Sequence, residues 1–156
     1  LLIHAWKGID EKLEIIGDGL EKNNLLTIIK DNNLTDQITI RSEVNSQELG
    51  NIYRRAKALI ITSSREGGPR VALEAAAFNL PVFGTNVGIM GELFPQELLA
   101  DPNNEEEIFS LIRSLVPLAK NLDVSAIKER IFESYTVESS AKRVGKIYDS
   151  VLSNSL

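Results

Sequence analysis

The sequence predicts an α/β fold: a Rossmann-like parallel sheet with helices on both faces. Segments with the apolar character of strands alternate with helix-like segments at intervals of roughly 20 to 25 residues, the rhythm of βαβ units. The 156 residues, 43% of them hydrophobic, are enough to bury one sizeable core. No internal repeat or low-complexity linker divides the chain, so we expect a single domain over residues 1–156.

The first half of the chain carries the alternation. We expect strands at residues 12–17, 37–40, 57–62 and 82–84. We expect helices between them at residues 20–30, 46–56 and 69–78. Ser46 can cap the second of these helices, which carries Leu49, Ile52, Tyr53 and Ala56 on one apolar stripe. In the first strand, Leu13, Ile15 and Ile16 are predicted to be buried.

The second half is helical in character. An acidic triplet, Glu105 to Glu107, is well placed at a helix start, and Asp123 can cap a second helix. A third helix is expected over 137–152, with an apolar seam. We expect all three to pack around the sheet as supports.

The stretch from Ser63 to Gly91 holds the candidate chemistry. It places Glu66 and Glu74 on either side of a Gly-Gly-Pro corner, in which Gly68 is expected at the N-cap and Pro69 at the first helical position. The helix that follows is apolar on every side except at Glu74, so we expect it to be buried.

A carboxylate on a buried helix needs hydrogen-bond donors. Backbone amides or a basic side chain could supply them, or a hydroxyl-rich ligand could. The amides at Gly67, Gly68 and Arg70 would meanwhile offer an anion site at the positive end of the helix dipole. Sugar hydroxyls beside a phosphate are what a nucleotide-sugar presents. The residues alone leave these readings open.

In a parallel sheet, ligands sit at the carboxyl ends of the strands. The turns after the expected strands should therefore share one edge. They are residues 17–19, 41–45, 63–68 and 85–91.

Composition removes several classes of function. A net charge of −5 without a basic cluster argues against nucleic acid or an anionic membrane as the main partner. The absence of cysteine excludes disulfides and thiolate metal sites and suits the cytoplasm. No run has the apolar length of a membrane span, although a peripheral contact at the inner face of the membrane stays open.

The central segment EGGPRVALEAAAFNLPVFGTNVGIMGEL resembles the donor-binding half of the group 1 nucleotide-sugar glycosyltransferases, retaining enzymes of the two-domain GT-B fold. The family hallmark is two glutamates with seven residues between them, followed by a small-residue helix and a PV strand. Glu66 and Glu74 have that spacing. LEIIGDG, NIYRRAKALIITSS and IFESYTVESSAKRVGKIY are similar to further family segments, so the resemblance covers most of the chain.

The resemblance implies roles for individual residues. Glu66 would be the catalytic-site carboxylate that accepts hydrogen bonds from the donor sugar, and Glu74 would bind the ribose. The Arg41 to Val44 loop would contact the nucleobase, and Arg70 could meet a phosphate or make a surface salt bridge. The donor-binding set also contains Gly67, Gly68, Pro69, Val71, Gly17, Gly19, Ser42, Glu43, Val44 and Gly88.

The implied reaction moves a sugar from a nucleoside diphosphate to a hydroxyl of an acceptor glycan, lipid or protein, with retention. No cofactor is implied, and the sequence has no Asp-x-Asp pair, which fits enzymes that need no divalent metal. Family members open this domain with a strand that is not matched here, and an acceptor domain precedes it. We therefore expect a fragment of a longer enzyme, without its first strand and inactive alone.

Two other interpretations remain. One is a sugar-nucleotide epimerase or a phosphorylase of the same architecture; the first would need acid/base groups from elsewhere and the second a cofactor lysine that is not evident. The other is a flavodoxin-like binding module without catalysis. The acidic cluster and lysine of receiver domains are absent, and Glu74 would have no role in such a module.

Overall fold

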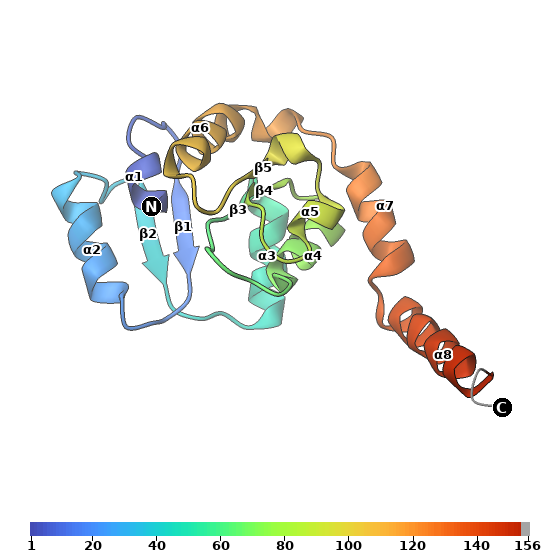
Figure 1. Cartoon of the computed structure of the whole chain (residues 1–156). Coiled ribbons are helices and arrows are strands. Elements are labelled where there is room, and N and C mark those ends of the chain that lie inside the picture. The colour runs from blue at the N-terminus through green and yellow to red at the C-terminus, as the bar shows by residue number, and fades with distance from the viewer. Residues whose placement is uncertain (154–156) are drawn as a thin grey trace.

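The structure, a computed structural model, describes residues 1–153 and contains two parallel sheets within them (Figure 1). The first pairs β1 (Leu13–Ile16) with β2 (Ile38–Arg41), with Leu13 opposite Ile38. The second has the order β3-β4-β5, built from β3 (Leu59–Ile61), β4 (Val82–Thr85) and β5 (Leu99–Ala100). The α/β class and the parallel strands are thus confirmed.

Helices connect the strands in the expected alternation. They are α1 (Leu2–Ala5), α2 (Lys22–Asp31), α3 (Ser46–Arg55), α4 (Arg70–Ala77), α5 (Met90–Leu93), α6 (Glu105–Leu115), α7 (Ser125–Ser134), α8 (Val137–Ser153) and the 3-10 turns η1 (Gln96–Leu98) and η2 (Val116–Asn121). The α2 helix starts two residues later than expected, and Leu20 is fully exposed. The N-cap of α3 is Asn45, not Ser46, because the Asn45 side chain accepts a hydrogen bond from the Glu48 amide at 2.9 Å.

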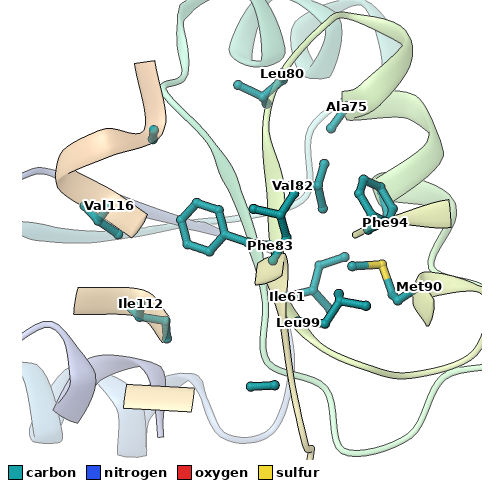
Figure 2. Packing of buried hydrophobic residues seen from close by; sticks show 14 of the residues in the cluster. Ile61, Ala75, Leu80, Val82, Phe83, Met90, Phe94, Leu99, Ile112 and Val116 are labelled. Atoms are coloured by element: carbon teal, nitrogen blue, oxygen red, sulfur yellow. The ribbon is translucent and has the colours of Figure 1, made fainter. Parts of the chain in front are cut away.

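Strand β4 is the centre of the core. Its successive side chains point to opposite faces, as in any strand. Figure 2 shows Phe83 directed toward Ile112 and Val116, whereas Val82 lies on the side of Ala75. Both strand residues are fully buried. Helices therefore cover both faces of this sheet, α6 and η2 on one and α4 on the other, as the fold class requires.

The single sheet expected from the sequence is divided between β1 and β3. Within residues 1–153 no strand pairing joins these two strands. A groove of about 1180 Å³ lies there instead, lined by residues of both β1 and β3 and by Leu2, Leu49 and Val116 from the helices around it.

The groove explains one difference from the sequence prediction. Leu13, Ile15 and Ile16 were expected to be buried but are only half-buried, as are Leu59 and Ile60 of β3. These residues have the continuous apolar character of central strands, yet one edge of each strand faces the groove.

The C-terminal helices pack less uniformly than expected. The α6 helix lies on β4 and β5, and α7 contacts α4 and α5. The α8 helix instead extends away from the body (Figure 1). Its apolar seam is largely exposed, at 89% for Val137, 51% for Val144 and 67% for Tyr148. The expectation that all three helices support the sheet is therefore wrong for α8.

Candidate functional site

The predicted site loops gather at the carboxyl ends of the strands. In Figure 1 the arrows of β1 and β2 point to the lower edge of the molecule, where the loops that follow them lie. This shared edge follows from the parallel direction of the strands.

Asp18 joins the loop after β1 to the loop after β2. Its carboxylate accepts hydrogen bonds from the Glu43 amide at 3.3 Å and the Ser42 hydroxyl at 3.4 Å, and pairs with Lys22 at 2.6 Å. The hydrogen bond from Lys22 is the main reason that the pKa of Asp18 is lowered. Gly17 and Gly19 flank this carboxylate, so the turn and the predicted nucleobase loop are one unit.

Glu66 sits in the exposed loop between β3 and α4. One of its carboxylate oxygens accepts a hydrogen bond from the Ser63 hydroxyl at 3.1 Å. Ser63 is itself fixed, because the fully buried Thr85 donates from its hydroxyl to the Ser63 carbonyl at 2.7 Å. A chain of contacts thus runs from the end of β4 to the Glu66 carboxylate.

The α4 helix begins one residue later than predicted. Pro69 is the N-cap, with an extended ψ of 101°, and Arg70 is the first helical residue. The helix is also less buried than expected: Ala72, Ala75 and Ala76 face the core, but Val71 is 41% exposed. The run of alanines made every face look apolar, although only one face has a partner.

Glu74 lies at the rim of that buried face, with its side chain 39% exposed. The Tyr53 hydroxyl donates to Glu74 Oε2 at 3.2 Å, and Arg70 Nη2 lies 3.7 Å from Oε1. Arg70 is itself 88% exposed, so its pair with Glu74 is a surface one. A tyrosine and an arginine therefore provide the partners that the sequence required for this carboxylate.

Gly88 packs against the corner before α4. Its φ is +52°, and a Cβ placed on it would lie 2.3 Å from the Gly67 carbonyl oxygen. Only glycine fits this approach. The close neighbour of Gly88 in the described chain is thus the protein backbone, and its contact with a ligand stays a prediction.

The groove between the two sheets also reaches the site. Its lining includes four of the predicted donor-binding residues, Gly17, Glu43, Val44 and Val71. Tyr53 lies in the same lining. The other predicted residues stand outside it, on the exposed loops or the first turns of α4: Glu66, Gly67, Gly68, Pro69, Arg70, Glu74, Gly19, Ser42 and Gly88.

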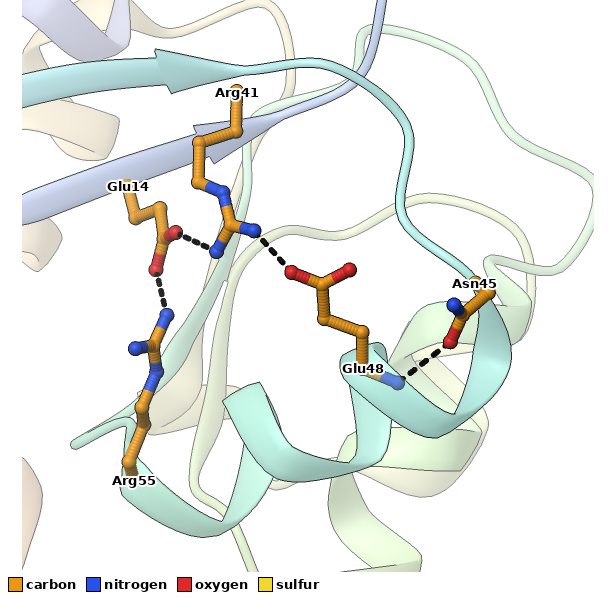
Figure 3. Close-up of polar contacts among 5 residues, drawn as sticks. All are labelled: Glu14, Arg41, Asn45, Glu48 and Arg55. Carbon is orange, nitrogen blue, oxygen red and sulfur yellow. Dashed lines mark hydrogen bonds and ion pairs between the residues drawn. The ribbon is translucent and has the colours of Figure 1, made fainter.

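An ion-pair network fixes α3 against the first sheet (Figure 3). Glu14 of β1 accepts from Arg41 of β2 and from Arg55 of α3, each at 2.7 Å. Arg41 also donates to Glu48 near the start of α3. The hydrogen bond to Glu14, followed by that to Glu48, raises the pKa of Arg41 above its ordinary value. The helix that carries Tyr53 is thereby held across the groove from β1.

No sequence motif pointed to Tyr53 or Thr85 as supporting residues of the site. Tyr53 was recognised only as part of the apolar stripe of its helix. For Thr85 the sequence holds one signal, because it places a hydroxyl-bearing side chain directly after the apolar strand residues 82–84. In the structure Thr85 is the buried polar residue of the described chain. A buried hydroxyl requires a partner, and here the partner is the site loop.

The described chain, residues 1–153, holds no group of three or more His, Cys, Asp or Glu side chains placed to bind a metal ion. Over the same residues, no helix has both the length and the apolar character needed to cross a bilayer.

The fold and the paired glutamates can be compared with known proteins. Residues 1–146 match the family model for glycosyl transferases group 1. The chain belongs to this family. Its homologues are glycosyltransferases, and the family membership supports glycosyl transfer as the activity of the proteins to which such chains belong.

Relatives of the group 1 chain are much longer than the chain itself. An uncharacterized glycosyltransferase of Methanocaldococcus jannaschii is 29% identical over 97% of the chain and 44% of that protein. The D-inositol 3-phosphate glycosyltransferase of Paenarthrobacter aurescens is 39% identical over 51% of the chain and 20% of its own length. The chain thus spans less than half of these relatives.

Solved structures share the fold. Sucrose-phosphate synthase from Thermosynechococcus elongatus matches 98% of the chain and 42% of its own chain, with a TM-score of 0.81 at 23% identity. Staphylococcus aureus TarM, in a complex with UDP, matches 94% of the chain and 32% of its own, with a TM-score of 0.79 at 21% identity. These neighbours are GT-B glycosyltransferases, and the chain corresponds to part of each.

Proposed function

We propose that this chain is the donor-binding domain of a retaining glycosyltransferase that moves a sugar from a nucleoside-diphosphate sugar to an acceptor hydroxyl. One observation carries the proposal. Glu66 precedes α4 and Glu74 lies in its second turn, both carboxylates are accessible, and the Gly67-Gly68 segment is between them. Two carboxylates that can accept hydrogen bonds from hydroxyls thereby flank the backbone amides before the helix. This arrangement suits a ligand with sugar hydroxyls on either side of a diphosphate.

The roles divide along the donor. The Glu66 carboxylate, steadied by Ser63, accepts from hydroxyls of the transferred sugar. The Glu74 carboxylate accepts from the ribose, and the amides from Gly67 to Val71 take the diphosphate. The unit of Gly17, Gly19, Ser42, Glu43 and Val44, tied together by Asp18, receives the base. Charge that develops on the departing diphosphate is stabilised by preoriented amides and by Arg70.

Two structural neighbours support the kind of donor. TarM was crystallised with UDP, and the pneumococcal O-GlcNAc transferase GtfA with UDP and GlcNAc. GtfA matches 96% of the chain with a TM-score of 0.73. Both are below 25% identity, so they support a nucleotide-sugar donor without choosing its base.

The groove supports the additional strand expected from the family resemblance. The Leu13 amide donates to the carbonyl of Gln37, just before β2, and the Gly17 amide donates to that of Arg41 in β2, each at 2.9 Å. The amides of Glu14 and Ile16 between them therefore face away from β2. Leu59 donates to Pro81, so the amide of Ile60 faces away from β4. A parallel strand between β1 and β3 would join the sheets in the order 3-2-1-4-5-6 of doubly wound folds.

That strand and an acceptor domain would come from the longer protein to which the chain corresponds. We propose that the chain alone has no transferase activity. We also propose that the whole enzyme works in the cytoplasm without a divalent metal, with possible contacts to the inner face of the membrane.

Hydrogen exchange tests the inserted strand. Slow exchange of the amides of Glu14, Ile16 and Ile60 in a longer protein, against fast exchange in this chain, would support it. Equal exchange rates in the two proteins would contradict it.

Binding tests the proposed donor site. The isotopically labelled chain is titrated with UDP, GDP and ADP, each with and without its hexose, and followed by heteronuclear NMR. We expect one nucleotide to shift amides at residues 41–45 and 67–71, and Glu74→Ala to abolish the response. Asp123→Asn, remote in sequence from the site loops, serves as the control and should respond like the parent chain. If the shifts lie at other surfaces or survive Glu74→Ala, the assignment of the site is wrong.

A further inference from the structure

We propose that Tyr53 is a positioning residue for Glu74: its hydroxyl fixes one carboxylate oxygen so that the other is presented to the ribose diol of the donor. This inference rests on the proposed function, since it concerns how Glu74 does its work. It adds a residue from α3 that lies outside the motif containing the paired glutamates.

The contact joins two helices that are distant in sequence. Tyr53 is in α3 and Glu74 in α4, and the Tyr53 hydroxyl lies 3.2 Å from Glu74 Oε2. Tyr53 is only 6% exposed. A buried phenol hydroxyl requires a hydrogen-bond partner, and the Glu74 carboxylate is the partner that the structure supplies.

The direction of the hydroxyl is set by packing of the Tyr53 ring. Its centroid lies 5.6 Å from that of Phe78, the residue that ends α4. Phe78 is in turn held by Arg54, whose guanidinium carbon lies 5.0 Å from the ring centroid, and by Gly50, where a Cβ would lie 3.3 Å from the Phe78 ring. The ring therefore has little freedom to turn away from Glu74.

The protonation state of Tyr53 makes its hydroxyl the donor and Glu74 the acceptor in this contact. Burial, and then the nearby charge of Glu74, raises the pKa of Tyr53 well above its ordinary value. The hydroxyl stays protonated at neutral pH and donates a hydrogen bond to Glu74 Oε2. The partner of Oε1 in the described chain is Arg70 at 3.7 Å, and that side chain is 88% exposed. Oε1 is therefore the oxygen that a ligand can engage by displacing an exposed side chain.

A fixed carboxylate matters for a diol. Two neighbouring hydroxyls donate to one carboxylate only when its plane matches theirs, so orientation established before binding reduces the entropic cost of ordering the side chain. Without the Tyr53 hydroxyl, the half-exposed Glu74 side chain would be free to rotate, and each ribose hydroxyl would contribute less.

The experiment compares the chain with Tyr53→Phe, which keeps the ring and removes the hydroxyl, and with the matched control Tyr148→Phe, which removes the hydroxyl of an exposed tyrosine in α8. Each protein is titrated by NMR with UDP, GDP and ADP and with their 2′-deoxy analogues. The parent chain should prefer the ribonucleotide severalfold. Tyr53→Phe should reduce that preference at least threefold, whereas Tyr148→Phe should leave it unchanged. An unchanged preference in Tyr53→Phe would overturn the proposal.

A second readout needs no nucleotide. Carbon relaxation of the Glu74 side chain should report larger motion in Tyr53→Phe than in the parent chain, with the backbone spectrum preserved. If Glu74 is equally ordered in both, Tyr53 does not position it. If the parent chain binds no nucleotide but Glu74 loosens in the variant, the proposed donor site fails while the positioning by Tyr53 stands.

Discussion

Gly88 and Gly67 are in backbone contact, so the loop after β4 is locked to the corner before α4. A Cβ on Gly88 would lie 2.3 Å from the Gly67 carbonyl oxygen and 2.7 Å from that of Glu66. Thr85, three residues earlier, donates to the Ser63 carbonyl at 2.7 Å. Two points of attachment thus fix the loop that carries Glu66, and the conformation of the candidate site depends on the end of β4.

Gly88→Ala should therefore be destabilising. The positive φ alone costs an alanine about 1–2 kcal/mol, and the overlap with the Gly67 carbonyl adds to that. Urea unfolding monitored by circular dichroism measures the resulting decrease in the free energy of unfolding. The matched control is Gly145→Ala in α8, where a Cβ meets nothing within 4 Å, and it should not lower stability. Equal stability of the two variants would show that the Gly88 contact is not formed.

Glu14→Gln should weaken the attachment of α3 to the first sheet. The substitution replaces a carboxylate that holds both Arg41 and Arg55 at 2.7 Å. For the Arg55 pair alone, an exposed ion pair is worth about 0.2–1 kcal/mol. The loss, measured as a lower urea midpoint, should shrink in 1 M salt because salt screens exposed charges. Glu97→Gln, at an exposed residue without a salt bridge in the described chain, is the control; a loss that salt does not reduce would contradict this account.

Asp18→Asn should loosen the predicted nucleobase loop. The folded pKa of Asp18 is lowered below 3.8, so its contacts are present at neutral pH and are lost as pH falls through the lowered value. The Glu43 amide should exchange faster in the variant at pH 7. In the parent chain, the chemical shift of the Glu43 amide should change with pH in a transition whose midpoint lies below pH 3.8.

The control for Asp18 is Asp123→Asn. Asp123 accepts from the Ser125 amide at 3.0 Å, and this hydrogen bond lowers the pKa of Asp123 as well. Its substitution should leave the exchange of Glu43 unchanged. Faster exchange in both variants would mean a general loosening of the chain, with no specific role for Asp18.

Tyr53 should give the chain an alkaline dependence of stability. Its pKa is raised in the folded state above the ordinary 10.0, so the stabilisation is complete below pH 10.0 and is lost as pH rises toward the folded value. The unfolding free energy should fall by up to about 1.4 kcal/mol per pH unit above that point from this group alone. Tyr53→Phe should remove that component, which urea unfolding on either side of pH 10.0 can measure. Identical slopes in the two proteins would contradict the buried hydroxyl.

The strand and helix alternation could be predicted because it depends on local patterns. Val82 and Phe83 form an apolar run that only a buried strand or helix can satisfy, and β4 lies where it was expected. The start of α4 was misplaced by one residue because proline suits either the N-cap or the first helical position, and its observed ψ of 101° decides for the N-cap.

Contacts between distant segments could not be predicted in the same way. Periodicity placed Tyr53 on an apolar stripe, but only the packing of α3 on α4 shows that its hydroxyl meets Glu74. The same pattern predicted a buried seam on α8, which the structure leaves exposed at Val144 and Tyr148. An apolar stripe indicates that a helix can pack; it does not identify the partner.

A crystal structure of the chain with its best-binding nucleoside diphosphate, obtained at millimolar concentration, tests the donor-site proposal most directly. We expect ribose hydroxyls within hydrogen-bond distance of Glu74, with the diphosphate over the amides from Gly67 to Val71 and the base beside residues 42–44. A nucleotide bound elsewhere, with Glu74 still directed only to Tyr53 and Arg70, would contradict it.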